Sequence, residues 1–435
     1  MFAVLNLLVF VFLTGYAFIL LLSKPSYVKL SRTEKVLLTG REKFLLLTLV
    51  TGMVMAGDFS SLRLIAWLSL MLFAFVIYRK SPRFNRLTLV YIIFLMWLGI
   101  TMVWSPDLLY GIRVYLKYLY PFVALLFATA FVHSREFIFV AMRWMLITTF
   151  IASLFLGGFM TNILGIWFFY FGGLFWPMST LADYLAVMSA VAFVMWWRTG
   201  EKKYLLLIGW FMLSSVLHGT RTGLLSIGMM LMVGSYLRYK LVSLPYIIGA
   251  VFIGLAMILF VPQVKEKMFY DPERVVGIED ILSAQEENNL NTSARAYMWE
   301  ELLHRFHEDH EWMGSGLGSV QHYMYENFVF GGLQVAHSDY VQMMCDSGNV
   351  GLLLYLLFPL MLYLYTIRYV HKKPSTPMVT SAILALLAYA AVLPAMGFDN
   401  VVNYSFASHS YPFIFAGIFL AYRRIEKQQQ RIQNV

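Results

Sequence analysis

The chain has little charge, and this excludes an ordinary soluble fold. Only 13% of its 435 residues are charged, whereas 60% are hydrophobic and 17% are aromatic. Soluble domains carry about 25% charged residues. A soluble fold could not bury this much apolar surface, so most of it must face lipid. The composition therefore predicts a protein that crosses a membrane many times.

The chain also has a single cysteine and no phosphate-binding loop of the Walker type. Cys345 is the single cysteine, which excludes an intrachain disulfide. The sequence contains no glycine-rich loop of the Walker type and no cluster with metal-ligand spacing. We therefore expect no ATP-driven chemistry, no metal and no cofactor. The first apolar run, 3–22, lacks a preceding basic region and is interpreted as an uncleaved helix.

Acidic residues are rare outside one stretch of the chain. Residues 262–348 hold 15 of the 24 acidic residues but only 5 of the 33 basic ones. The other basic residues cluster in short connectors and at the C-terminus, as in the cytoplasmic loops of membrane proteins. The net charge of +9 therefore indicates topology and contact with anionic lipid, and it does not indicate a nucleic-acid partner.

The apolar runs predict an all-α polytopic transmembrane bundle of about 12–13 spans. The runs are 3–22, 44–57, 62–78, 88–103, 114–132, 137–156, 181–198, 204–217, 222–239, 241–261, 349–370, 378–395 and 406–422. The short aromatic segment 163–176 is expected to be interfacial or re-entrant. The basic segment 23–43 favours the cytoplasm and would leave the N-terminus outside.

Four regions follow from this pattern. Residues 1–261 would form an N-terminal transmembrane bundle of about ten spans, and 262–348 a large, mainly helical loop on the side opposite the basic connectors, which is the periplasm in a bacterium. Residues 349–422 would form the C-terminal transmembrane helices, and 423–435 a basic cytoplasmic tail. Within the loop we expect a helix from an N-cap at Ser293 to Gly314, a flexible turn over 314–319, and a second helix from about His337.

Two arginines are candidates for phosphate contacts, and both are expected on the same side of the membrane as the acidic stretch 262–348. Arg221 begins an apolar run, where its guanidinium could bind phosphate oxygens in a bidentate manner; the alternative is contact with lipid headgroups. Arg295 could act similarly, or it could form a salt bridge within the acidic loop. Both alternatives stay open on the sequence alone.

His337 is the candidate general base. A helix starting there would place His337 and Tyr340 on one face, next to a stretch that reads as buried in lipid. The alternative is a capping or interfacial histidine. Arg63, Arg113 and Lys117 lie near predicted outer helix ends, and the last two share a helix face, as phosphate ligands or solvated charges would. Asp183 is an acid near a span, either functional or an interfacial cap.

Three motifs together resemble the O-antigen ligase and O-antigen polymerase superfamily. They are "GTRTGLLSIG" (219–228), "SARAYMWEELLHRFHEDHEWMGSGLGS" (293–319) and "HSDYVQMMCDSGNVGLLLYLL" (337–357). That family shows R-x-G at a helix start, then R-x-x-x-W…G-x-G, then H-[NS]-x-[YF]-[LV] before a G-x-x-G-L span. The matching residues here are Arg221, Gly223, Arg295, Trp299, Gly316, Gly318, His337, Ser338, Tyr340, Gly348 and Gly351.

The resemblance, closest to lipopolysaccharide O-antigen ligases, implies a metal-independent, inverting glycosyltransferase of the bacterial inner membrane that acts on the periplasmic face. The donor would be a glycan on undecaprenyl pyrophosphate, and the acceptor a lipid A–core sugar hydroxyl. His337 would be the base and Arg221 and Arg295 would stabilise the pyrophosphate. Further substrate contacts are expected from Arg63, Arg113, Lys117, Tyr340 and Asp339.

Two other functions stay open at this point. A repeat-unit polymerase of the same superfamily would use a second lipid-linked repeat as its acceptor. A lipid-linked glycan transporter would move the same substrate without any chemistry, and it should tolerate the loss of His337 better than an enzyme.

Overall fold

The computed structural model describes residues 2–433 apart from 32, 55–58, 157–177, 218–219, 246, 250–251, 253–258, 261, 284–288, 290–294 and 328–334. The described chain is almost entirely helical, which confirms the predicted all-α fold. The main helices are α1 (Phe2–Leu22), α2 (Gly40–Val50), α3 (Ser60–Ile77), α4 (Arg86–Thr101), α5 (Leu108–Phe131), α6 (Phe137–Leu156), α8 (Met178–Thr199), α9 (Lys203–Leu217), α10 (Arg221–Tyr239), α12 (Pro262–Met268), α13 (Ile278–Ser283), α14 (Arg295–Phe306), α15 (Ser319–Asn327), α16 (Asp339–Val370), α17 (Pro377–Phe398) and α18 (Ser410–Gln433).

Seven of the described helices are long and apolar enough to cross a membrane, namely α3, α4, α5, α6, α8, α16 and α17. Two shorter apolar helical segments, Asn6–Leu22 and Lys203–Ser215, accompany them. A helix satisfies its own backbone hydrogen bonds, which is what a chain in hydrocarbon requires. The protein is therefore a multi-pass membrane protein, as its composition predicts.

Several segments differ from the expectation or lie beyond what can be compared. Residues 44–50 of the predicted run 44–57 belong to the 11-residue helix α2, which ends at Val50, and 55–57 lie outside the described residues. The basic segment 23–43 contains a small antiparallel hairpin that the sequence did not predict, in which β1 (Ser26–Lys29) pairs with β2 (Lys35–Leu38). The segment 163–176, ten of the 21 residues of 241–261 and Ser293 lie outside the described residues.

Side-chain caps fix where the helices at the site begin. Asp107 accepts the backbone N–H groups of Leu109 and Tyr110 at the start of α5. Ser338 accepts the N–H of Val341 at the start of α16. Such caps satisfy donors that the helix itself leaves unpaired, so polar residues at the ends of apolar runs set the boundaries of the spans.

The bundle has inner and outer helices. In the apolar part of α8, 89% of the residues are buried inside the protein, against 28% for α16. Helices α5, α17 and α18 pack together at the centre. Gly417 of α18 lies against the carbonyl oxygen of Leu125 of α5, where a Cβ would not fit. The poorly buried helices expose their apolar side chains to the surroundings, as lipid contact requires.

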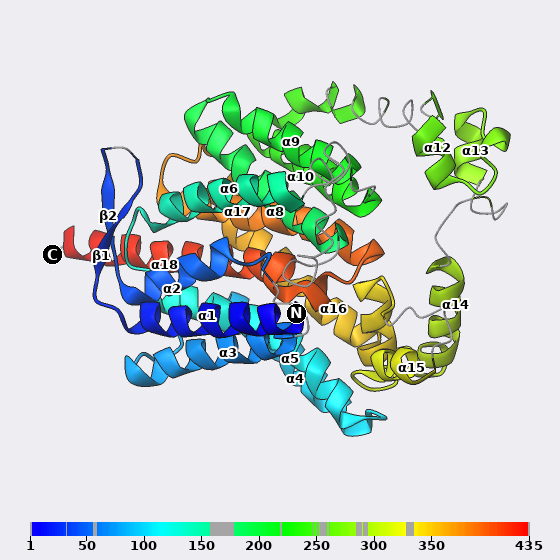
Figure 1. Ribbon diagram of the computed structural model, residues 1–435, viewed down its shortest axis with the longest axis horizontal. Helices are drawn as coiled ribbons and strands as arrows, with labels where there is room; N and C mark the ends of the chain where they lie inside the picture. Colours follow the sequence, from blue (N-terminus) through cyan, green and yellow to red (C-terminus); the bar gives the residue numbers. More distant parts are fainter. Residues whose placement is uncertain are drawn as a thin grey trace.

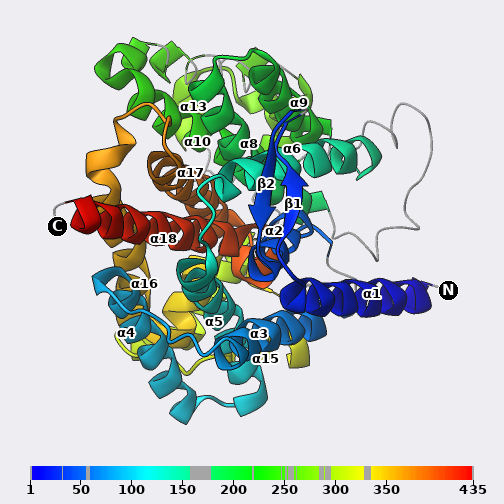
Figure 2. The same ribbon diagram turned by 90° about the vertical axis from the view of Figure 1, so that its left-hand side faces the viewer.

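The two ends of the bundle carry different structures (Figure 1). Helices α14 and α15 lie at one end, where α16 begins and α17 finishes; we call this the loop end. The hairpin and the C-terminus lie at the other end, which we call the C-terminal end, and Figure 2 views the bundle from that side. Helix α18 runs from near the loop end to the C-terminus and includes most of the predicted basic tail.

The 314–319 turn is packed, and the expectation of a flexible segment is wrong. Residues Gly314, Gly316, Leu317, Gly318 and Ser319 are buried. Trp104 donates to the carbonyl oxygen of Gly314 at 3.1 Å, which ties the turn to the end of α4. The expected single helix before it is also broken, because α14 ends at Phe306 and a 3-10 turn follows over Glu308–His310.

The helix expected from His337 begins at Asp339 and is interrupted once. Gly348 has φ 70° and breaks the helical geometry inside α16. A side chain there would overlap the carbonyl of Trp312, so the break is where the 312–319 turn packs against α16. Glycine suits this position because it adopts positive φ without steric cost.

Candidate active site

His337 occupies a strained position just before α16. Its φ of 51° lies in the left-handed region, which non-glycine residues seldom adopt and which is common at functional sites. Its backbone N–H donates to Oδ1 of Asn400 at 3.1 Å. Since His337 is outside the helix, the predicted shared helix face with Tyr340 is wrong.

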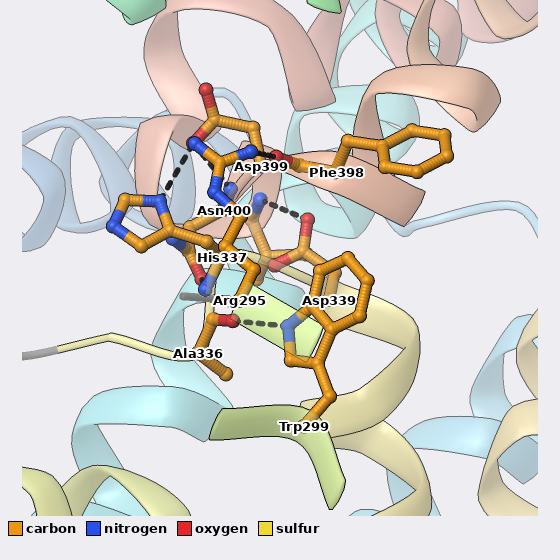
Figure 3. A network of polar contacts seen from close by, with 9 residues as sticks. Arg295, Trp299, Ala336, His337, Asp339, Phe398, Asp399 and Asn400 are labelled. Carbon is orange, nitrogen blue, oxygen red and sulfur yellow. Dashed lines mark hydrogen bonds and ion pairs between the residues drawn. The ribbon is translucent and has the colours of Figure 1, made fainter. Parts of the chain in front are cut away.

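The imidazole of His337 is held by two residues that the sequence did not point out (Figure 3). Its Nδ1 lies 3.2 Å from Nδ2 of Asn400 and 3.5 Å from Oδ1 of Asp399. Asp399 is only 2% exposed, whereas the His337 side chain is 21% exposed. The histidine therefore reaches the surface of the site, while the carboxylate behind it is shielded from water.

This arrangement sets what the imidazole can do. Two partners act on Nδ1 in opposite directions. The side-chain NH2 of Asn400 can only donate, so at 3.2 Å it favours a lone pair on Nδ1, whereas the buried carboxylate of Asp399 favours a proton on Nδ1 and stabilises the imidazolium once it forms. The 3.5 Å separation from Asp399 is longer than a direct hydrogen bond, so this pair must close slightly to engage. With the proton on Nδ1, Nε2 carries the lone pair, and His337 can accept a proton from a substrate hydroxyl.

Asp399 and Asn400 are placed by the end of α17. The N–H of Asp399 donates to Ala395 at 2.8 Å, and the N–H of Asn400 donates to Oδ1 of Asp399 at 2.8 Å. A 3-10 turn, η7 (Val401–Tyr404), follows directly. A possible signal was the polar pair in "GFDNVVNY" after an apolar run, but nothing in the sequence links it to a histidine 62 residues away.

Helix α14 brings Arg295 to the same place. Its Nη1 donates to the carbonyl oxygen of Phe398 at 2.5 Å, immediately before Asp399. Burial lowers the pKa of Arg295, while the negative charge of Asp399 raises it and the positive charge of Arg221 lowers it. The guanidinium is therefore partly desolvated and lies near the His337 group, as the sequence analysis proposed for a phosphate ligand.

Trp299, one helical turn after Arg295, holds the histidine segment itself. Its Nε1–H donates to the carbonyl oxygen of Ala336 at 2.7 Å, and its ring packs 6.4 Å from that of Phe398. Residues four apart lie on one face of a helix. One face of α14 therefore contacts both halves of the site, the segment before α16 and the end of α17.

Arg221 is the first residue of α10 and is exposed. Its charge acts on Arg295, so the two guanidinium groups are close enough to repel. Gly223 packs against Ala182 of α8, where a Cβ would meet the alanine side chain at 2.6 Å. This close approach fixes the start of α10. Two cations whose charges act on each other would be stabilised by an anionic leaving group between them.

Lys117 and Asp339 support the loop that carries Asp399. The Nζ of Lys117 donates to Oδ1 of Asn403, and Oδ2 of Asp339 accepts the N–H of Val402 at 3.0 Å. Both contacts hold the turn η7 in place. The structure therefore places these two predicted substrate contacts where they hold the loop.

The other three predicted substrate contacts lie elsewhere. Arg63 is fully buried, donates to the carbonyl and hydroxyl oxygens of Thr51 at 3.0 Å each, and lies between the rings of Trp67 and Phe406. Arg113 is exposed and covers the ring of Tyr110. Tyr340 donates to the carbonyl of Leu393 at 2.7 Å. None of these contacts involves His337.

Asp183 of α8 is 2% exposed, and its two carboxylate oxygens have no hydrogen-bond partner among the described residues. Its electrostatic neighbours are Asp399 and Asp339. Among the described residues, no three His, Cys, Asp or Glu side chains gather as a metal site would require. The charged side chains that contact His337 or the segment 398–403 include Arg295, Lys117, Asp339 and Asp399.

A comparison with protein families matches the part of the chain that contains most of the candidate site residues. The O-antigen ligase family model matches residues 206–356, a range that includes Arg221, Arg295 and His337. This match confirms the resemblance carried by the three motifs. Asp399 and Asn400 lie beyond the matched range. No curated protein matches the chain.

Proposed function

We propose that this chain belongs to the O-antigen ligase and polymerase superfamily, whose O-antigen ligase model matches residues 206–356, and that within it the chain acts as an O-antigen ligase. Members of that family are glycosyltransferase-like enzymes of O-antigen processing, with lipid-linked glycans and lipid A–core molecules as substrates in general. The proposed reaction transfers an O-antigen glycan from undecaprenyl pyrophosphate to a sugar hydroxyl of the lipid A–core. It takes place at the loop end, which would face the periplasm.

One observation carries this proposal: three separate segments bring a histidine, a buried carboxylate and a desolvated arginine together. His337 comes from the segment before α16, Asp399 from the end of α17 and Arg295 from the start of α14 (Figure 3). Glycosyl transfer from a pyrophosphate requires both functions, a base for the attacking hydroxyl and cations for the leaving group.

In the proposed step, Nε2 of His337 takes the proton of the acceptor hydroxyl as its oxygen forms a bond to the anomeric carbon. The bond from that carbon to the pyrophosphate oxygen breaks, and attack from the opposite face inverts the configuration. Asp399 stabilises the imidazolium. Arg295 and Arg221 stabilise the charge that develops on the undecaprenyl pyrophosphate.

If the arginines balance the negative charge of the leaving pyrophosphate, the reaction does not require a divalent ion. Removing one preorganised electrostatic donor typically lowers kcat by about 10²–10³-fold, and general base catalysis contributes about 10²–10⁴-fold. His337→Gln should therefore lose nearly all transfer, and Arg221→Ala should lose most of it.

The test uses the purified full chain with a lipid-linked glycan donor and lipid A–core, with products read on a gel. Growth in the mass of lipid A–core, insensitive to EDTA, supports the proposal. Full transfer by both His337→Gln and Arg221→Ala would contradict the proposed site. Products formed from the donor alone would assign a polymerase, and the absence of any new glycosidic bond would favour a transporter.

A further inference from the structure

A cavity lined by several basic side chains lies at the C-terminal end of the bundle, far along the helices from His337. It has a volume of about 410 Å³ and is bordered by the connector before α4, the end of α16 and the second half of α18. Five of its lining residues are cations: Arg83, Arg423, Arg424, Lys427 and Arg431. No carboxylate is among the described residues that line it. The described charged residues that line the cavity are therefore all positive.

None of the five cations forms an ion pair with a carboxylate among the described residues. Arg423 lies over the ring of Tyr365 at 5.1 Å, which fixes its direction without compensating its charge. Burial lowers the pKa of Arg424, and the positive charge of Arg83 lowers it further. Like charges held together in this way are destabilising unless an anion lies between them.

The start of α4 adds to the positive potential. Asn85, which lines the cavity, is the N-cap of this 16-residue helix, and its Oδ1 accepts the N–H groups of Leu87 and Thr88. A helix N-terminus carries partial positive charge, which favours an anion nearby. The dipole therefore acts in the same direction as the five side chains.

An apolar surface continues from the cavity. Phe84 lines it and is 60% exposed. Helices α4 and α16, which pack against each other, carry exposed apolar residues along their length, including Leu89 and Ile93 on α4 and Leu360 and Leu364 on α16. A soluble phosphate would use none of this surface, whereas the acyl chains of a lipid would cover it.

We propose that this cavity binds the phosphate headgroup of an anionic phospholipid, with its acyl chains lying along α4 and α16. The five cations and the start of α4 complement the phosphate, and the desolvated position of Arg424 suits a charge-assisted contact. Basic cavities between membrane helices are places where lipid headgroups are recognised. The site is independent of the proposed transfer, since it lies at the opposite end of α16 and α18.

The test compares lipid binding by the full chain and two double variants in detergent, using native mass spectrometry. The probes are dioleoyl phosphatidylglycerol and dioleoyl phosphatidylcholine at equal concentration. Arg424→Gln with Lys427→Gln removes two cations of the cavity. Since each cation near an anionic headgroup contributes roughly fivefold in affinity, phosphatidylglycerol binding should weaken about 30-fold.

The matched control is Lys372→Gln with Lys373→Gln, which removes the same charge from the same end but outside the cavity. It should leave phosphatidylglycerol binding unchanged. If the first double variant does not fold, Lys427→Gln alone, at an exposed position, should still weaken binding about fivefold.

Three outcomes would overturn the proposal. Equal losses in the two double variants would mean that net charge and not the cavity binds the lipid. Phosphatidylcholine binding as tightly as phosphatidylglycerol would exclude recognition of the anionic charge. Displacement of phosphatidylglycerol by inorganic phosphate at the same concentration would show that the acyl chains contribute nothing.

Discussion

Replacing Asp399 by Asn tests whether the buried carboxylate activates His337. The change keeps the size of the side chain and one acceptor oxygen, so the N–H of Asn400 retains its partner at Oδ1. It removes the negative charge near Nδ1 of His337. An amide oxygen at Oδ1 attracts a proton on Nδ1 less than a carboxylate does, so donation from Nδ2 of Asn400 would favour the tautomer whose Nε2 carries the proton and cannot act as a base.

The expected loss of rate follows from the kind of interaction that Asp399 makes with the imidazolium. A hydrogen bond to a charged group contributes roughly 1.5–3 kcal/mol, and a tenfold change in rate corresponds to about 1.4 kcal/mol. Because Asp399 is 2% exposed, water does not replace it readily. Losing the interaction should therefore lower kcat by about 10–150-fold, with little change in KM because the proposed contacts to the donor are Arg221 and Arg295 and not Asp399.

The assay is steady-state transfer by the purified chain, with thermal unfolding measured in parallel. The matched control is Asp346→Asn, another buried carboxylate whose Oδ1 accepts the N–H of Val320 at 3.0 Å and which makes no contact with His337. This control should change stability more than kcat. A rate for Asp399→Asn within about twofold of the unmodified protein would refute the role of the carboxylate, since loss of a charge-assisted hydrogen bond to the imidazolium predicts a loss of at least about tenfold.

Three further predictions follow from single contacts. Arg295→Lys should lower kcat by about 10²-fold because the fork of donors is lost, while Arg305→Lys in the same helix, paired with Glu301 at the surface, should change transfer little; equal effects would count against a site role. Trp299→Phe removes the donor to the buried carbonyl of Ala336 and should cost about 1–3 kcal/mol in the free energy of unfolding, seen as a lower Tm. Gly348→Ala should prevent the turn from packing and lower Tm strongly, whereas Gly209→Ala, with open space around it, should be neutral or stabilising; unchanged Tm in the first would contradict the packing.

The helices and their ends were within reach of the sequence. Apolar length alone predicts the spans that become α3, α4, α6 and α17, because a chain in hydrocarbon must form helices long enough to cross it. The motif residues Arg295 and His337 were also found from their types and their order. What the sequence could not show was the hairpin at 26–38, since basic connectors carry no period that separates a short hairpin from a loop.

The candidate site was predicted only in part. Asp399 and Asn400 escaped notice because pairing across 62 or 63 residues leaves no local pattern. His337 was expected inside a helix, yet its positive φ depends on the hydrogen bond from its N–H to Asn400. Arg63 was expected near a helix end facing substrate, but packing against Trp67 and Phe406 buries it.

The amino-acid sequence by itself determined that this chain is a helical membrane protein. It also determined that residues 262–348 are the acidic stretch and which histidine and arginines lie in the three motifs. These properties depend on composition and on short spacings, which are complete before the chain folds. The tertiary structure alone decided that Asp399 lies behind the imidazole, that Lys117 and Asp339 hold a loop, and that five cations converge on one cavity. Such placements depend on how helices distant in sequence pack against each other, because charges and hydrogen bonds act over a few ångströms in space.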